Sequence, residues 1–327
     1  IILSEKMQVI KKTGILEFIN TDIKISDVGG LENLKSWLNK RNNSWSESAK
    51  KYCLPAPKGV LITGVPGCGK SLTAKAMSAA WQLPLLKLDF GKIFSGIVGS
   101  SEENMRKAIK TAEAVAPSIL WVDEIEKSLS GMGSGSNGDS GTSSRIFGTF
   151  LTWMQEKTAP VFVIATANNI SGLPAELLRK GRFDEIFFVD LPTHRERKEI
   201  FQLHLNRRLN NDYIGQDLEV NDGLLERLAE QTEGFVGAEV EQAVISALYE
   251  AFFNQRPLLE KDLQESIVNT VPLSVTQKEQ ILALRQWANV RAVAATARED
   301  LKEYLSNERS EEPGDIKSSR GGRNLDF

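Results

Sequence analysis

The sequence predicts an α/β domain built around a five-stranded parallel sheet, followed by a second domain made only of helices. Between Gly59 and Asp190, short apolar runs alternate with longer amphipathic stretches, as strands and helices do around a buried parallel sheet. From Pro192 onward the pattern is helical throughout. The length of 327 residues, about twice that of a usual single domain, agrees with two domains.

Five apolar runs of four to six residues mark the strands. Runs of this length, bounded by polar and turn residues, are typical of strands that are buried on both faces. They occupy residues 60–63, 85–89, 118–123, 161–166 and 186–189.

A capping box marks the beginning of the helical domain. Thr193, directly after Pro192, is followed three residues later by Glu196, and each side chain can bond the backbone N–H of the other residue. Residues 274–298, rich in Ala, Leu and Gln, predict one long helix or two short ones. Two apolar stripes at helical spacing predict packed helices, and their members are Ile200, Phe201, Leu205 and Leu209 in the first and Val240, Ala243, Val244, Ala247, Leu248, Ala251 and Phe252 in the second.

One loop and the C-terminal end are expected to lack packed structure. Residues 128–144 contain five Gly and seven Ser, which predicts a mobile loop. The mixed charges and few apolar side chains of the last residues predict a disordered tail. The predicted parts of the chain are an N-terminal helical or linker segment at 1–24, the α/β core at 25–191, the helical domain at 192–272, C-terminal helices at 273–306 and the tail at 307–327.

The composition excludes several classes of protein. A net charge of -3 argues against attraction of the whole chain to nucleic acid or anionic lipid. With only Cys53, Cys68, His194 and His204, neither a disulfide framework nor a zinc cluster is expected. No apolar run approaches the roughly 20 residues of a membrane-spanning helix, and the N-terminus has no signal-peptide pattern. We therefore expect a reducing, cytosolic compartment and no membrane insertion.

Residues 64–71, GVPGCGKS, match the phosphate-binding pattern GxxxxGK[ST]. The motif lies between the first predicted strand and a helical pattern, which is the context it requires. Its backbone N–H groups face the phosphates, Lys70 reaches the β- and γ-phosphates, and the Ser71 hydroxyl binds Mg²⁺. A Gly-rich turn without a ligand is the structural alternative. The motif predicts that ATP and Mg²⁺ are bound by Gly64, Pro66, Gly67, Cys68, Gly69, Lys70, Ser71 and Leu72.

Residues 118–124, SILWVDE, form an apolar run that ends in two carboxylates. Following a phosphate loop, Asp123 would hold Mg²⁺ through water and Glu124 would polarise the attacking water. A general base of this kind contributes about 10² to 10⁴ in rate. In isolation, the same pair would be a solvated acidic strand end.

Three further polar residues follow the next strand. Asn168, in ATAN at 165–168, has an amide that would bridge the attacking water and the γ-phosphate. Arg179 and Arg182 flank a turn in LRKGRFD at 178–184. Taken singly, Asn168 is a turn residue and the two arginines are a solvated or structural pair.

The order of these motifs resembles the AAA subfamily of AAA+ ATPases. Further matches are DVGGL at 27–31, the Leu203 and His204 pair, and GFVGAE at 234–239. The resemblance spans residues 25–253, about 70% of the chain, and its flanks resemble a cyanobacterial and plastid-encoded group within the family. It implies a P-loop NTPase core of the AAA+ type followed by an all-α lid domain.

This resemblance also implies roles for individual residues. Arg179 and Arg182 would be arginine fingers that act in trans on ATP bound by the neighbouring subunit of a homo-oligomeric ring, expected to be a hexamer. A packed helix histidine is the alternative for His204. The residues implied to line the adenosine pocket are Asp27, Val28, Gly29, His204, Gly237 and Ala238.

Two features bear on what the ring does. At 94–99, FSGIVG places Ile97 where substrate-threading members have a pore-facing aromatic residue, which weakens the expected grip on a polypeptide. Segment 128–144 would be the second pore loop, and it carries no basic residue for holding nucleic acid. Cys68, inside the phosphate loop, is either a reactive thiol shielded by ATP or a small residue tolerated at a variable position.

Three functions remain after these observations. The first is an ATP-hydrolysing ring that remodels an unknown protein client. The second, favoured by Ile97, is a slow nucleotide-gated switch or scaffold that regulates photosynthesis or carbon metabolism without threading. The third, a DNA-acting machine, is disfavoured by the net charge and by the absence of a DNA-binding appendage. The resemblance implies a cyanobacterial cytoplasm or a plastid stroma.

Overall fold

The computed structural model divides the chain into two compact units. It describes residues 14–94, 100–127, 140–170, 172–179, 181–209 and 217–297, without the side chains of residues 100 and 140–144. Ile97, most of segment 128–144 and the tail 307–327 lie outside the described residues. Within them, the first unit contains residues 14–25, Ser36–Thr63 and Lys70–Phe187, and the second contains Ser26–Lys35, Gly64–Gly69 and 188–297.

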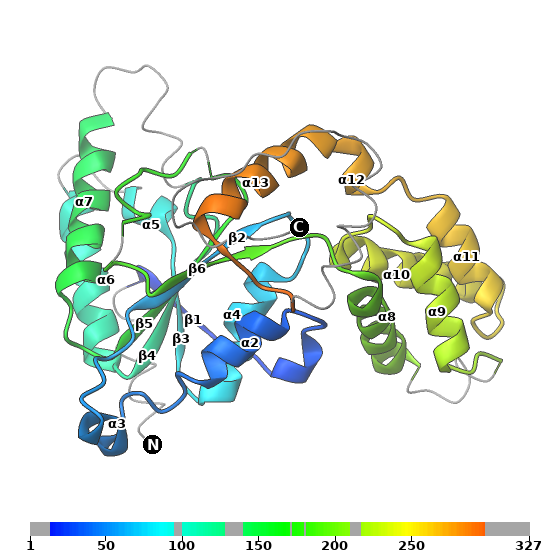
Figure 1. The fold of residues 1–327 in the computed structure, drawn as a ribbon, viewed down its shortest axis with the longest axis horizontal. Helices are drawn as coiled ribbons and strands as arrows, with labels where there is room; N and C mark the ends of the chain where they lie inside the picture. Colours follow the sequence, from blue (N-terminus) through cyan, green and yellow to red (C-terminus); the bar gives the residue numbers. More distant parts are fainter. Residues whose placement is uncertain are drawn as a thin grey trace. The chain divides into compact units, whose positions relative to one another are not determined.

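Within the part of the chain that the structure describes, the strands form a seven-stranded sheet in the order β1-β3-β4-β5-β2-β6-β7 (Figure 1). The pairs β2–β5, β3–β4 and β4–β5 are parallel, and β1 pairs with β3 in the antiparallel sense. Strands β2 to β6 correspond to the five predicted runs, so the predicted α/β fold class is confirmed. The strands are β1 (Leu16–Ile19), β2 (Gly59–Gly64), β3 (Leu85–Leu88), β4 (Ser118–Val122), β5 (Val161–Ala167), β6 (Glu185–Val189) and β7 (Val293–Ala294).

The two edge strands differ from the sequence prediction. Strand β1 lies in segment 1–24, which was expected to be helical or a linker, and it pairs with β3 along its whole length. Strand β7 lies inside segment 273–306, which was expected to be helical, and the N–H of Ala295 donates to the O of Phe188 at 2.8 Å. Both strands are too short for an alternating pattern of side chains to be visible in the sequence. They are held by backbone hydrogen bonds to the neighbouring strand, which leave no mark on the choice of side chains.

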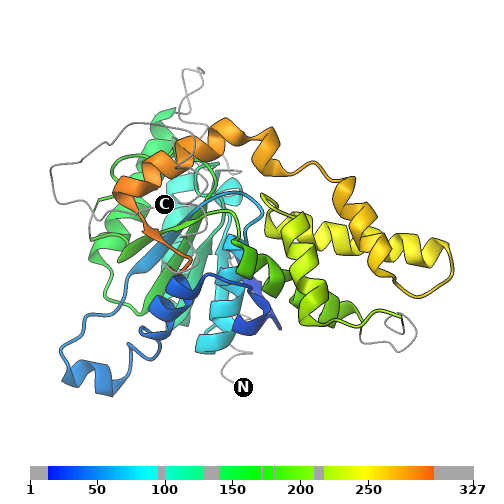
Figure 2. The ribbon, with the colours of Figure 1, turned by 45° about the vertical axis from the view of Figure 1, so that its right-hand side comes forward.

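Helices cover both faces of the sheet in the first unit. In both views α4 lies on one face and α6 and α7 lie on the other (Figures 1 and 2). Helix α7 begins at Ser140, so the predicted loop 128–144 is wrong over its last five residues. Its Gly and Ser residues are weak helix formers, but the buried stripe that follows, including Phe150 and Met154, outweighs local propensity. The helices are α3 (Glu47–Lys51), α4 (Lys70–Trp81), α5 (Phe90–Phe94), α6 (Ser100–Val115) and α7 (Ser140–Glu156); η1 (Ile25–Asp27) and α2 (Glu32–Asn39) span the division between the units.

Helices α8 to α11 of the second unit surround one apolar core. The capping box of Thr193 and Glu196 is present, as predicted, at the start of α8. The predicted stripe on α10 is buried at Val240, Ala243, Val244, Ala247 and Ala251 and half-buried at Leu248, but Phe252 is 81% exposed and does not belong to the core. Of the predicted segment 274–298, the described residues 274–297 contain parts of two helices and then β7. The helices are α8 (His194–Arg208), α9 (Asp222–Gln231), α10 (Gly237–Phe253), α11 (Glu260–Val268), α12 (Leu273–Thr276) and α13 (Lys278–Arg291).

The carboxylate of Glu196 joins three distant segments of the second unit. Its Oε1 accepts hydrogen bonds from the Leu31 N–H and the Thr296 hydroxyl, each at 3.0 Å, and its Oε2 accepts from the Thr193 N–H at 3.0 Å. Position 30 requires glycine, because a Cβ there would lie 2.3 Å from Oε1. Glu196 is only 4% exposed, so these donors have little access to water if the carboxylate is removed.

We expect Glu196→Ala to destabilise the protein by about 2–4 kcal/mol, because it leaves two backbone N–H groups and a hydroxyl without their acceptor. Urea unfolding followed by circular dichroism measures this change. Glu230→Ala, an exposed position on α9, is the control and should change stability by less than about 0.5 kcal/mol. Equal unfolding midpoints for the two variants would contradict the role of Glu196.

Candidate functional site

The phosphate loop follows β2 and ends where α4 begins. Gly64, Gly67 and Gly69 have φ values of 137°, 78° and 84°, which residues with a side chain rarely adopt. At Gly64 a Cβ would lie 2.0 Å from the O of Val189, and the Val65 N–H donates to that same oxygen at 2.9 Å. The glycines are therefore required by the backbone path of the loop.

The remaining residues of the predicted motif have different environments. Lys70 is buried at the first position of α4, and Ser71 and Leu72 are half-buried in its first turn. Pro66 is half-buried, and the Sγ of Cys68 lies 3.8 Å from its O. Cys68 also packs against the apolar cluster of Val65, Leu191, Val236 and Ile281.

In the first unit, Asp123 receives two hydroxyl donors on one oxygen. The Ser71 hydroxyl donates to Asp123 Oδ1 at 2.9 Å, and the Thr166 hydroxyl donates to the same atom at 2.6 Å. Parallel β4 and β5 place Val122 opposite Ala165. The next residues along the two strands, Asp123 and Thr166, therefore lie next to each other at the same edge of the sheet. The two predicted metal-binding residues, Ser71 and Asp123, are thus in contact.

Glu124, the predicted water-polarising residue, has both carboxylate oxygens engaged. Oε1 accepts a hydrogen bond from Asn168 Nδ2 at 2.9 Å, and Oε2 lies 2.6 Å from Lys127 Nζ. The hydrogen bond with Glu124 raises the pKa of Lys127. The N–H of Asn168 donates to Glu126 Oε1 at 2.9 Å, which fixes the turn after β5. Glu124 and Asn168, predicted separately, are therefore direct neighbours.

Arg179 and Arg182 lie in the turn before β6. Arg179 is exposed. Arg182 is half-buried, and its guanidinium donates to the O of Glu176 in the same turn. Arg182 thus stabilises its own turn, whereas the exposed Arg179 is free of burial constraints.

Two glycines of the predicted adenosine pocket, Gly29 and Gly237, lie close to Ile200 of α8 in the second unit. A Cβ at Gly29 would lie 2.8 Å from Ile200 Cγ1, and a Cβ at Gly237 would lie 3.7 Å from Ile200 Cδ1. The Ala238 N–H donates to the O of Gly67 at 3.0 Å, which attaches the start of α10 to the phosphate loop. Val28 is buried, and Asp27 and Ala238 are exposed.

His204 lies one helical turn after Ile200 and takes part in a polar network within the lid. Its Nδ1 lies 2.9 Å from Arg208 Nη1 and 3.7 Å from Glu241 Oε1. Burial lowers the pKa of His204 and so favours the neutral ring. This geometry agrees with the packed helix histidine that the sequence leaves open.

Three residues at the site were not predicted from the sequence. Thr166 and Ile200 lie within apolar runs and look like ordinary strand and helix residues. Glu126 is 7% exposed and accepts the backbone N–H of Asn168. The position of Glu126, two residues after the Asp-Glu pair, was the only available signal, and spacing alone gives it no role.

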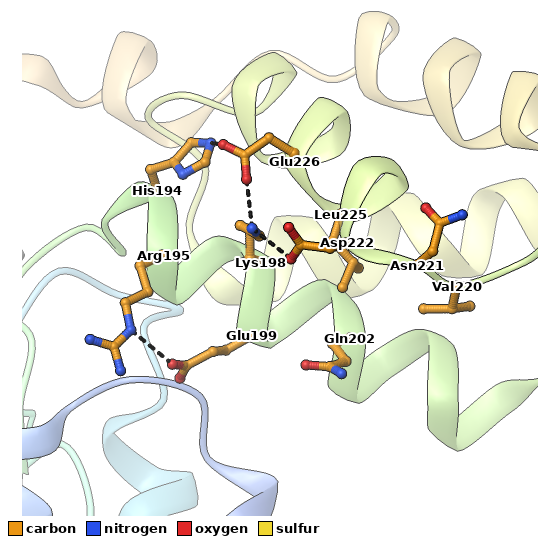
Figure 3. A pocket seen from close by; sticks show the side chains of 10 residues that line it. All are labelled: His194, Arg195, Lys198, Glu199, Gln202, Val220, Asn221, Asp222, Leu225 and Glu226. Carbon is orange, nitrogen blue, oxygen red and sulfur yellow. Dashed lines mark hydrogen bonds and ion pairs between the residues drawn. The ribbon is translucent and has the colours of Figure 1, made fainter.

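A cavity of about 360 Å³ lies between α8 and α9 of the second unit (Figure 3). Lys198 Nζ lies 2.9 Å from Asp222 Oδ1 and 2.5 Å from Glu226 Oε2, and His194 Nε2 lies 3.3 Å from Glu226 Oε1. These charges pair with one another across the cavity. Its lining includes none of the predicted ATP-site residues.

Two kinds of feature are absent from the residues that the structure describes. Among them, no group of three or more His, Cys, Asp and Glu side chains is arranged to hold a metal ion. None of the helices in those same stretches combines the length and the apolar character needed to cross a membrane.

The chain is similar to several known proteins. The AAA domain-containing protein ycf46 of Pyropia yezoensis is 49% identical over 288 residues, which are 88% of this chain and 57% of that protein. The protein of the same name from Gracilaria tenuistipitata var. liui is 50% identical over 287 residues, again 88% and 57%. The ATPase family protein 2 homolog of Caenorhabditis elegans is 31% identical over 71% of this chain and 32% of that protein. The chain thus spans a little over half the length of the ycf46 proteins.

Solved structures show the same fold. The crystal structure of the FIGL-1 AAA domain matches with a TM-score of 0.70 and 22% identity, over 88% of this chain and 96% of that one. The FIGL-1 AAA domain in complex with ADP matches with a TM-score of 0.69 and 22% identity, over 88% of this chain and 97% of that one. At this identity the likeness concerns the fold alone.

Two family models match the chain in the order in which the two folds occur. The model of the ATPase family associated with various cellular activities (AAA) matches residues 60–191, and the model of the AAA+ lid domain matches residues 222–265. Together they match more than half of the chain, and the relatives cover most of it. The chain therefore belongs to the AAA family of ATPases.

Proposed function

We propose that this chain binds and hydrolyses ATP as a subunit of a homo-oligomeric ring, expected to be a hexamer, that remodels a protein partner. The observation that carries the proposal is the contact network at the ends of β4 and β5. It joins Ser71 to Asp123 and Asn168 to Glu124, so the groups that would hold the metal and activate water are already arranged as neighbours. Family membership and an ADP complex of a protein with the same fold support nucleotide binding.

Mg²⁺ fits the donors that these residues offer. Ser71 Oγ and Asp123 Oδ1, 2.9 Å apart, are hard oxygen ligands of the kind Mg²⁺ prefers. A site with one carboxylate suits Mg²⁺, which keeps several waters and takes further oxygens from the phosphates. When bound, it neutralises developing charge on the phosphate oxygens.

The chain's own residues would divide the remaining tasks. Lys70 and the loop N–H groups would bind the phosphates, and Glu124 would accept a proton from the attacking water. Asn168 holds Glu124 Oε1, so the water must be met by Oε2. Lys127 pairs with Oε2, but the lysine side chain is 69% exposed, and such surface pairs are weak enough to open readily.

Arg179 and Arg182 are proposed to complete the site of the neighbouring subunit. A positive charge supplied in this way is worth about 10³ to 10⁵ in rate. The exposure of Arg179 supports the role for that residue, whereas Arg182 would first have to leave the O of Glu176. The likeness to ycf46 proteins supports a plastid stroma or a cyanobacterial cytoplasm as the compartment.

We expect Glu124→Gln to reduce the rate of ATP hydrolysis by about 10² to 10⁴ while ATP binding persists. Glutamine can still accept the hydrogen bond from Asn168, but it cannot accept a proton from water. Steady-state phosphate release and equilibrium binding of ATP measure the two effects. Glu156→Gln, at an exposed position on α7, is the matched control and should match the wild type; an active Glu124→Gln protein would contradict the proposed role.

We expect ATPase activity per subunit to rise with protein concentration, because each site needs an arginine from a neighbour. Arg179→Ala subunits mixed into wild-type protein should lower activity more steeply than dilution alone, and Arg182→Ala should do the same. Arg227→Ala, which opens an exposed pair with Glu260, is the control. Mixing it into wild-type protein should leave the ATPase activity per subunit unchanged. Activity that is independent of concentration, with arginine variants equal to the wild type, would favour a monomeric nucleotide switch.

A further inference from the structure

Thr166 lies at the end of β5, one strand away from the Asp-Glu pair. It is 1% exposed, and the register that pairs Val122 with Ala165 brings it beside the turn that follows β4. Neither the phosphate-loop motif nor the Asp-Glu motif includes this residue. Its surroundings give it more than a packing role.

The side chain and the backbone of Thr166 bind three consecutive residues. Its hydroxyl donates to Asp123 Oδ1 at 2.6 Å and accepts the N–H of Glu124 at 3.0 Å. Its carbonyl oxygen accepts the N–H of Ile125 at 2.9 Å. A hydroxyl has a single proton to donate, so the proton that reaches Asp123 leaves the oxygen available as the acceptor for Glu124.

The backbone of Glu124 needs support of this kind. Its φ of 47° lies in the left-handed region, which is unfavourable for a residue with a side chain. Such conformations persist only where the surrounding structure fixes them, and they are frequent at functional sites. Thr166 accepts hydrogen bonds from the N–H groups of Glu124 and Ile125, so it fixes the backbone on both sides of the Glu124 Cα.

We propose that Thr166 is a positioning residue that couples the metal-holding carboxylate of Asp123 to the water-activating carboxylate of Glu124. This inference rests on the proposed function, since it assigns a further residue to the same reaction. One hydroxyl orients Asp123 through its proton and sets the backbone of Glu124 through its lone pair. A displacement of either carboxylate would therefore affect both metal binding by Asp123 and water activation by Glu124.

Substitutions at Thr166 separate the hydroxyl from the shape of the side chain. Valine has nearly the same volume and the same branched Cβ, but it removes the hydroxyl and leaves the Glu124 N–H without its acceptor. Serine retains the hydroxyl and loses only a methyl group. Thr111→Val, on α6, removes a buried hydroxyl that bonds the O of Lys107 and serves as the matched control.

The test measures ATP hydrolysis by the full chain at varied ATP and Mg²⁺, together with equilibrium binding of ADP with and without Mg²⁺. Thr166→Val should lower kcat about 10- to 100-fold with a KM for ATP within about 3-fold of the wild type, because a small misplacement acts on the chemical step. It should also raise the Mg²⁺ concentration for half-maximal activity and abolish the tightening of ADP binding by Mg²⁺. Thr166→Ser and Thr111→Val should match the wild type within about 3-fold on every measure.

The proposal is overturned if Thr166→Val keeps wild-type kcat and Mg²⁺ dependence, or if Thr166→Ser loses as much as Thr166→Val. If Thr166→Val fails to fold by circular dichroism, the comparison of Thr166→Ser with Thr166→Ala replaces it, with activity retained only by the serine variant. If the wild-type chain hydrolyses no ATP, the proposed function fails, and ADP binding then decides the inference alone. Loss of the Mg²⁺ effect in Thr166→Val but not in Thr166→Ser supports it, and equal Mg²⁺ effects in all variants refute it.

Discussion

The register of β4 against β5 is the constraint on which the contacts of Asp123, Glu124 and Thr166 depend. Because Val122 pairs with Ala165, Asp123 and Thr166 leave their strands side by side and their polar groups meet. Side chains alternate between the faces of a strand, so a shift of one residue would turn the Thr166 hydroxyl to the opposite face. Both strands are fully buried, so such a shift would require the apolar core to repack on both faces of the sheet. Packing of the apolar core therefore determines the geometry of the carboxylates.

Within the second unit, a different physical principle brings the predicted adenosine-pocket residues close to their neighbours. Close packing at glycines, rather than strand register, brings Gly29 to Ile200 and Gly67 to Val236 at the start of α10. Each approach is possible because a glycine leaves room for its neighbour. Glu196 then supplies the hydrogen-bond acceptors that fix the incoming segment at Leu31. Glycines and one buried carboxylate thus position the segments of the second unit, as strand register positions the residues of the first.

The sequence was sufficient for the fold class and for locating the motifs, but insufficient for the residues that support them. Buried parallel strands are visible as apolar runs, and the chemistry predicted for Lys70, Ser71 and Asp123 rests on their spacing. Thr166 could not be recognised, because its role exists only in the register of two strands. Strands β1 and β7 could not be predicted for a related reason, since runs of four and two residues are too short to show a strand pattern. The start of α7 at Ser140 shows that a buried apolar stripe can draw weak helix formers into a helix.

The hydrogen bonds of Glu196 and Asn33 also determine the order in which the chain can complete its fold during synthesis. Leu31 is 165 residues from Glu196, and Asn33 Nδ2 donates to the O of Thr296 across 263 residues of sequence. The ribosome makes the chain from its N-terminus at about 5–20 residues per second, and domains fold as units once their parts have emerged. Segment Ser26–Lys35 can therefore bond Glu196 and Glu199 long before its remaining partners at residues 294–296 have left the ribosome. A truncated translation product that lacks β7 would contain every motif residue and still lack the bonds from Asn33 to Ala294 and Thr296.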